Sequence, residues 1–168
     1  QLQDFSNKVH IPFGCLLLEE PPEEVVPIPY LRTGKGEVKE VSLNVYDTII
    51  QLQRRQDWLA DFLEENEQEP LPFVGKFDSA TDYRTIVADM REVLALPEDW
   101  ASDHQTWEKA INHFTEQIEE AGIIVSFNSV VGNNTHRAIP VEECRGFVLV
   151  HPLAPFLFVN SADAKSAQ

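Results

Sequence analysis

The spacing of hydrophobic residues changes at Gly122, and this change limits the chain to folds that place helices before strands. Before Gly122, long segments repeat hydrophobic residues at the 3.6-residue period of an amphipathic helix. After it, the short runs IIVSF, GFVLVH and FLFVN are rich in the β-branched and aromatic residues that favour strands. We therefore expect an α+β fold in which a helical segment is followed by a small antiparallel three-stranded sheet.

Three helices are expected, at about residues 47–66, 79–96 and 103–121. Asp47 suits the start of the first helix as a cap, and Ser79 with Asp82 imitates a capping box at the start of the second. Gly122 suits the end of the third helix. Each helix carries one hydrophobic stripe, which we interpret as core-forming. The stripes are Ile49, Leu52, Leu59, Phe62 and Leu63; Tyr83, Ile86, Val87, Met90, Val93 and Leu94; and Trp107, Ile111, Phe114 and Ile118.

The connections between the three predicted strands differ in length. The strands are expected at residues 123–127, 146–151 and 156–160. The PLAP sequence at 152–155 is short enough for an antiparallel turn. The connection over residues 128–145 is long for a loop without a function or a packing role.

The remaining chain divides into two N-terminal parts. Residues 19–46 hold four prolines and show neither a helical nor a strand period in their hydrophobic residues, which is typical of an extended linker. Residues 1–18 form a short apolar helical piece that cannot bury itself. The expected organisation is therefore a short helical piece over 1–18, a linker over 19–46, a helical subdomain over 47–122 and a sheet region over 123–168. Because the chain opens without Met and ends where a helix is beginning, we expect both ends to be cut from something longer.

The charge balance excludes some classes of partner. Thirteen Lys and Arg residues against 28 Asp and Glu give a net charge of −15, which repels phosphate backbones and anionic membranes. The charge is either an ordinary acidic surface or an attraction for a basic protein partner. Cys15 and Cys144 are too few for a disulfide framework, so we expect a cytoplasmic protein. No run reaches the roughly 18 apolar residues of a membrane span.

The chain has no recognisable catalytic motif of its own. It contains no HExxH, P-loop, GxGxxG or GxSxG sequence, and its five histidines form no zinc-binding pair at i, i+4. One polar cluster lies in the long connection: Asn133, Asn134, Thr135, His136 and Arg137. These residues either orient a ligand or satisfy the main chain of a turn. We assign no catalytic residue and no metal ligand.

The C-terminal third nevertheless resembles a known family. The segments VVGNNTHR and ECRGFVLVHPLAPFLFVNSADAKSAQ are similar to the ImmA/IrrE family of zinc metallopeptidase-like bacterial proteins. QRRQDWLADFLEENEQEPLPFVG and EEPPEEVVPIPYLRT resemble a branch of long family members, although Tyr30-Leu31 stands where that family suggests Asp-Phe. The first eighteen residues, QLQDFSNKVHIPFGCLLL, resemble the closing helix of an XRE-type helix-turn-helix domain.

The resemblance implies an incomplete zincin-like scaffold. In this family a strand ending in Asn leads into a helix that carries HExxH, so we expect the zinc-ligand histidines and the glutamate base after Gln168. These 168 residues would then hold no cofactor and be inactive alone, with zinc expected in the intact parent. The implied function is cleavage of a partner repressor or regulatory protein in stress response or mobile-element control. DNA contact is expected only through the upstream domain.

The resemblance also points to one strand beside the expected cleft. Phe147, Val148 and Leu149 form a candidate edge that could pair with an extended substrate; alternatively they form an ordinary strand paired internally. The alternative function is a non-enzymatic binding module, or the regulatory half of a toxin–antitoxin-like pair, in which the helical segment recognises a protein. An intact HExxH in the parent favours the enzyme, and a degenerate one favours the binding module.

Overall fold

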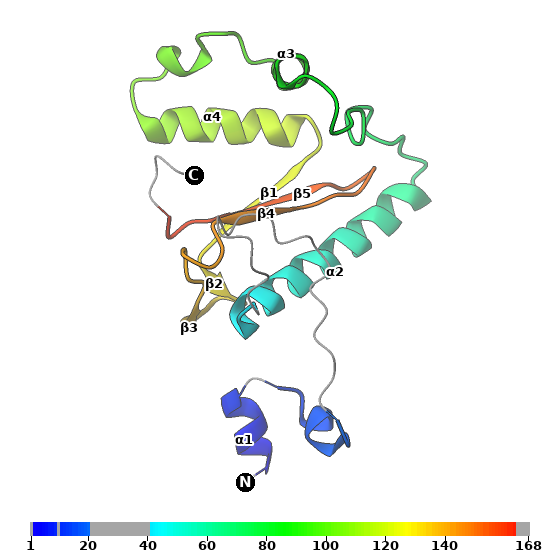
Figure 1. The fold of residues 1–168 in the computed structure, drawn as a ribbon, viewed down its shortest axis with the longest axis vertical. Helices are drawn as coiled ribbons and strands as arrows, with labels where there is room; N and C mark the ends of the chain where they lie inside the picture. The colour runs from blue at the N-terminus through cyan, green and yellow to red at the C-terminus, as the bar shows by residue number, and fades with distance from the viewer. Residues whose placement is uncertain (1, 10, 21–40, 164–168) are drawn as a thin grey trace.

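The computed structural model describes residues 2–9, 11–20 and 41–163 (Figure 1). These residues form the α+β fold that the sequence predicts. The helices are α1 (Leu2–Val9), α2 (Leu43–Glu65), α3 (Tyr83–Val93) and α4 (Trp107–Glu120), with short 3₁₀ helices η1 (Phe13–Leu17) and η2 (Trp100–Asp103). The strands are β1 (Ile124–Asn128), β2 (Val130–Val131), β3 (Asn134–Ala138), β4 (Gly146–Leu149) and β5 (Phe156–Asn160). No helix in this part of the chain is long and apolar enough to cross a membrane.

The main sheet is mixed, so the prediction of an entirely antiparallel sheet is wrong. Its strand order is β1-β5-β4. The short turn places β4 and β5 antiparallel, as predicted, but β1 pairs with β5 in parallel. The physical reason is the long connection after β1, which lets β5 return on the inner side of β4. Part of that connection, β2 and β3, forms a separate antiparallel hairpin.

The main sheet lies between two helices, α2 on one face and α4 on the other (Figure 1). Side chains of Phe156 and Phe158 on β5 pack with Ile49 and Leu52 of α2 in the larger core. The neighbouring β5 residue Leu157 points to the opposite face and joins the smaller core under α4. The strict alternation along β5 therefore supplies both cores, as expected for a central strand covered on both faces.

The first two helices begin at residues other than the predicted ones. Ser42, and not Asp47, caps α2, because its hydroxyl accepts from the Val45 N–H, so residues 43–46 of the predicted linker are helical. Asp82 caps α3 by accepting from the Arg84 N–H. Ser79 precedes this helix and lies in a turn. Pattern alone places helix ends poorly, because caps depend on a few local hydrogen bonds.

The third predicted helix is divided. Its first residue, Asp103, is the last residue of η2, and α4 starts only after Thr106, whose hydroxyl accepts from the Lys109 N–H. Gly122 ends the helical region as predicted, with φ +93°. Such a φ favours glycine because other residues pay a steric cost there.

The predicted stripe of α3 reaches the core only at Leu94, the residue after the helix, which is buried with Ile118; for most of the stripe the core-forming prediction is wrong. No residue of α3 is buried, and Tyr83, Val87 and Met90 are exposed. In Figure 1, α4 lies between α3 and the sheet, so α3 has no sheet face to cover. Trp107 at the start of α4 and Phe62 near the end of α2 are exposed too. The hydrophobic period identified these helices correctly but overstated their burial.

The N-terminal piece consists of α1 and η1, which pack against each other. Ser6 is its buried residue, and its hydroxyl donates to the Ile11 carbonyl oxygen at 2.6 Å. Most of the predicted linker, residues 21–40, lies outside the described residues, as do residues 164–168, where the sequence announces a helix.

Candidate functional site

The predicted substrate strand, β4, lies at one edge of the main sheet. The Asn160 N–H donates to the Arg145 carbonyl oxygen at 2.9 Å, which identifies Arg145 and Asn160 as a hydrogen-bonded pair. Because such pairs alternate in an antiparallel ladder, the main-chain groups of Phe147 and Leu149 face β5. Those of Gly146 and Val148 face away from β5, and no other described strand pairs with them.

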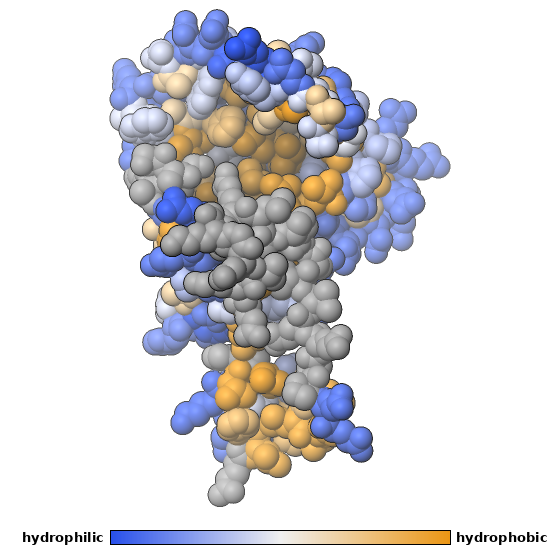
Figure 2. Space-filling model, in the orientation of Figure 1, coloured by the Kyte–Doolittle hydropathy of each residue, from blue (hydrophilic) through white to orange (hydrophobic). Residues whose placement is uncertain are grey.

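The three predicted side chains divide between the two faces of the sheet. Phe147 stacks on Phe158, with ring centroids 4.8 Å apart, and Leu149 is 3% exposed, so both belong to the core under α2. Val148 lies on the opposite face and is 51% exposed. Figure 2 shows hydrophobic residues gathered below α4, on the side of the sheet that this helix covers in part. Of the three residues, only Val148 presents its side chain to a partner.

Close packing holds the β4 main chain against β5. A Cβ added at Gly146 would lie 2.6 Å from the Phe158 carbonyl oxygen, so any other residue here would force the two main chains apart. At the other end, the buried Gln56 side chain on α2 donates to the Leu149 carbonyl oxygen. The edge is therefore held at both ends before any partner arrives, which lowers the cost of ordering it on binding.

The predicted polar loop is the β2–β3 hairpin. Asn133 lies in its turn with φ +62°, and the Asn134 side chain accepts from the His136 N–H. Thr135 and His136 are exposed on β3. Arg137 instead points toward α2, so the structure does not bring these five side chains into one cluster.

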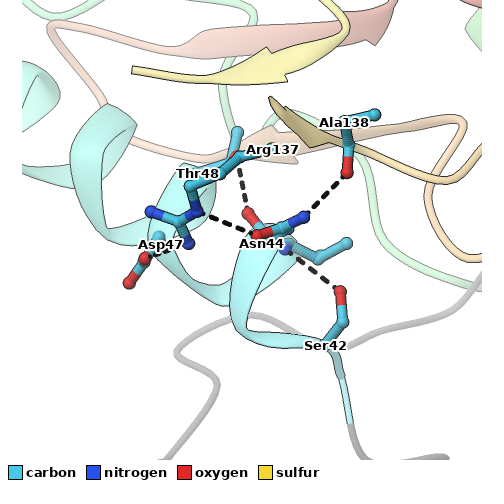
Figure 3. Close-up of polar contacts among 7 residues, drawn as sticks. Ser42, Asn44, Asp47, Thr48, Arg137 and Ala138 are labelled. Atoms are coloured by element: carbon cyan, nitrogen blue, oxygen red, sulfur yellow. Dashed lines mark hydrogen bonds and ion pairs between the residues drawn. The ribbon is translucent and has the colours of Figure 1, made fainter. Parts of the chain in front are cut away.

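Arg137 joins the hairpin to the start of α2 (Figure 3). Its guanidinium lies 2.6 Å from an Asp47 carboxylate oxygen, and its Nε donates to the Asn44 Oδ1 at 3.1 Å. Asn44 in turn donates to the Ala138 carbonyl oxygen at 2.8 Å. Asp47, predicted as a helix cap, thus acts as an ion-pair partner. These contacts leave the Arg137 guanidinium committed to holding the hairpin in place.

The structure also contains a cavity that the sequence did not indicate. It has a volume of about 300 Å³ and lies between α2 and β1. Leu52, Leu59, Trp58 and Arg55 line it from α2, and Ile124 from β1. Helical periodicity placed Leu52 and Leu59 in the core stripe, but no local signal shows which strand lies opposite them.

The described residues do not fit the zinc ion that the family resemblance implies. They contain no group of three or more His, Cys, Asp or Glu side chains that could hold a metal. The rings of His104 and His113 lie 4.8 Å apart beside Trp100, but these are two side chains only. Structural zinc sites use four protein ligands and catalytic sites three. We therefore derive no chemical step through zinc from these residues.

No protein-family model, curated protein or solved structure matches the chain. The comparisons therefore neither support nor oppose the ImmA/IrrE resemblance.

Proposed function

We propose that this chain is the substrate-positioning part of a zinc metallopeptidase-type regulator, and that the free edge of β4 receives an extended segment of a partner protein. The observation that carries the proposal is the outward direction of the Gly146 and Val148 main-chain groups. An extended segment that pairs with such an edge gains main-chain hydrogen bonds along its whole length.

The position of β4 supports peptide pairing in a second way. Val148 adds an exposed hydrophobic side chain to the edge, beside exposed Val150. A partner segment with alternating apolar residues can cover this surface while its main chain pairs with the strand. Affinity then comes from the main chain and selectivity from the side chain that meets Val148.

The remaining roles follow from the resemblance. The partner is a repressor or another regulatory protein, and hydrolysis belongs to an HExxH helix of the intact protein after Gln168. DNA contact belongs to a helix-turn-helix upstream of residues 1–18, since a net charge of −15 opposes contact by these residues. We place the protein in the cytoplasm because two cysteines in 168 residues are too few for a disulfide framework.

The first test is the sequence of the parent reading frame beyond Gln168. An intact HExxH there is expected, and the longer protein should then cleave a neighbouring repressor in a reaction that a chelator abolishes and zinc restores. A reading frame without the two histidines would contradict the peptidase assignment.

The second test addresses β4 in the longer protein. Val148→Pro removes an N–H that faces away from β5, so the sheet should persist while KM for the partner rises. Val148→Thr keeps that N–H and should leave KM close to the original value. Leu149→Pro serves as the folding control, because it removes an N–H that faces β5. An unchanged KM in folded Val148→Pro would exclude β4 as the recruiting edge.

A binding module without hydrolysis is the second candidate function. The exposed residues Tyr83, Val87 and Met90 lie at i, i+4 and i+7 on α3, which is the spacing that a helix uses to dock in a groove. Under this alternative, as in a toxin–antitoxin-like pair, Val87→Glu should abolish partner binding and Val148→Pro should not.

A further inference from the structure

The second edge of the main sheet, formed by β1, is also open. The Ile124 N–H donates to Pro155 at 2.9 Å, and the Asn128 carbonyl accepts from Ser161 at 3.1 Å. Because alternate residues of a parallel strand face the same neighbour, the main-chain groups of Val125 and Phe127 face away from β5. No described strand pairs with β1 on that side.

The cavity described above runs beside this open edge. Leu52 and Leu59 form its wall on α2, and Phe156 and Ile124 contribute from the sheet. Val125 also lines the cavity, although its side chain packs in the core on the opposite face. The part of Val125 that borders the cavity is therefore its main chain. The apolar groove and the main-chain groups of β1 that face away from β5 therefore lie next to each other.

An exposed aromatic pair borders this groove. Trp58 lines the cavity and is 67% exposed, and it stacks on Phe62 with ring centroids 5.9 Å apart and planes 14° apart. A stacked, exposed Trp–Phe pair on a helix is costly in water unless a partner covers it. Large aromatic side chains of this kind supply much of the energy of protein interfaces.

Charge selects the kind of segment that fits. Among the described residues, Arg55 is the only charged one that lines the groove, and it forms no ion pair with any of the others. The chain as a whole is strongly acidic, so this guanidinium is a local exception that favours a carboxylate. A lysine or arginine at the same place on a partner would meet a like charge.

We propose that the groove between α2 and β1 binds an extended peptide segment that pairs with the β1 edge, inserts an apolar side chain between Leu52, Leu59 and Phe156, and places a carboxylate at Arg55. Trp58 covers the bound segment from the helix side. This site is separate from β4, so the segment adds to the sheet at the edge opposite the one that recruits the substrate. It gives the protein a second, independent contact with an acidic, β-forming partner sequence.

The test measures binding of labelled synthetic peptides to the 168-residue chain by fluorescence anisotropy. The probe is a seven-residue peptide of alternating Val and Thr with one Glu, prepared as a set in which the Glu occupies each position in turn. Two variants of the peptide that binds best carry Gln or Lys in place of Glu. A third carries N-methyl groups on alternate peptide nitrogens, which removes the donors needed for strand pairing.

The expected results distinguish the three parts of the proposal. The Gln peptide should bind roughly 2- to 5-fold more weakly than the Glu peptide, as for an exposed ion pair. Arg55→Gln should remove that difference, and Arg54→Gln, at a residue outside the groove, should preserve it. Trp58→Ala should weaken binding by about 10-fold or more, while Trp58→Phe should retain most of it.

Several results would overturn the proposal. The first is the absence of saturable binding by every Glu peptide. Equal affinity of the N-methylated peptide excludes strand pairing, and equal effects of Arg54→Gln and Arg55→Gln exclude the carboxylate contact. A dimer of the chain that Trp58→Ala dissociates, seen by sedimentation equilibrium, means that a second copy occupies the groove. Val148→Pro should leave peptide binding unchanged, so this test fails or succeeds independently of the β4 proposal.

Discussion

Gln56 on α2 donates a hydrogen bond to the main-chain oxygen of Leu149 at the end of β4, at 2.9 Å. The same Nε2 atom donates to the Ala154 carbonyl oxygen at 2.8 Å, just before β5 begins. One buried amide therefore joins α2 to both ends of the turn between two strands. The Leu71 N–H also donates to the Pro152 carbonyl oxygen of this turn at 2.8 Å, but Gln56 is the residue that ties both ends of the turn to α2, and this makes it a sensitive position.

Gln56→Ala should lower the free energy of unfolding by about 2–4 kcal/mol, because it removes two buried hydrogen bonds and leaves the buried Ala154 carbonyl oxygen without its amide donor. Urea unfolding measures the change. Gln53→Ala, on the same helix and half-buried, should cost much less. Equal losses in the two variants would show that the amide contributes only through its volume.

Gly146→Ala should destabilise the chain by about 1–3 kcal/mol, the usual cost of forcing an extra methyl group into a packed site. The obstacle is the Phe158 carbonyl oxygen, which is main chain and cannot rotate away. Gly14→Ala is the matched control, since a Cβ there meets no atom within 4 Å. Thermal unfolding of both variants checks the prediction, and similar melting temperatures would contradict it.

Asn160→Asp should be among the most damaging single substitutions in the sheet. Asn160 is 0% exposed and its Nδ2 donates to the carbonyl oxygens of Ile139 and Cys144. A carboxylate at this site would face two acceptors, and the cost of about 3 kcal/mol or more should shrink as pH falls and the carboxyl becomes protonated.

Asn134→Asp is the control for that experiment. The exposed Asn134 side chain acts as an acceptor toward the His136 N–H, and a carboxylate can do the same. Urea unfolding at several pH values should show a large, pH-dependent loss for Asn160→Asp alone. A loss at Asn160 that does not change with pH would contradict the assignment of the carbonyl contacts.

Asp78 should titrate below its ordinary value of 3.8. Hydrogen bonds from the Thr81 hydroxyl and the Ala80 N–H lower the pKa of this exposed carboxyl by stabilising its charged form. Because the folded-state pKa is depressed, the contribution is present above the unfolded value and is lost as pH falls through the folded value. An NMR titration of the carboxyl carbon measures the pKa, and Thr81→Val should raise it.

The sequence predicted the type and order of the main elements well. Hydrophobic period identified α2, α3 and α4 and the strands β1, β4 and β5, because a residue's side-chain direction follows from its own backbone conformation. The element ends were less certain. The sequence placed Ser42 in the linker, whereas in the structure its hydroxyl accepts from the Val45 N–H and caps α2.

The final Asn-Ser of the strand region shows how a local signal acquires its meaning. The sequence indicated that Asn160 ends a strand and announces a new element. In the structure, its Oδ1 accepts from the Ala162 N–H, which turns the chain, while its Nδ2 bonds carbonyls from a distant loop. The turn-forming role of Oδ1 is local and can be predicted from the sequence. The role of Nδ2 depends on which loop folds over the end of the strand.

The amino-acid sequence by itself determined which segments are helical or extended, where the chain turns, and that its surface is acidic, because these properties depend on residues close together in the chain. Only the tertiary structure decided that β5 is the central strand, that α3 lies away from the sheet, and that Leu52 and Leu59 face Ile124 across a groove. Strand edges all offer the same N–H and C=O groups, so pairing partners are chosen by the packing of side chains far apart in sequence. The two free edges on which both proposals rest are therefore properties of the assembled sheet.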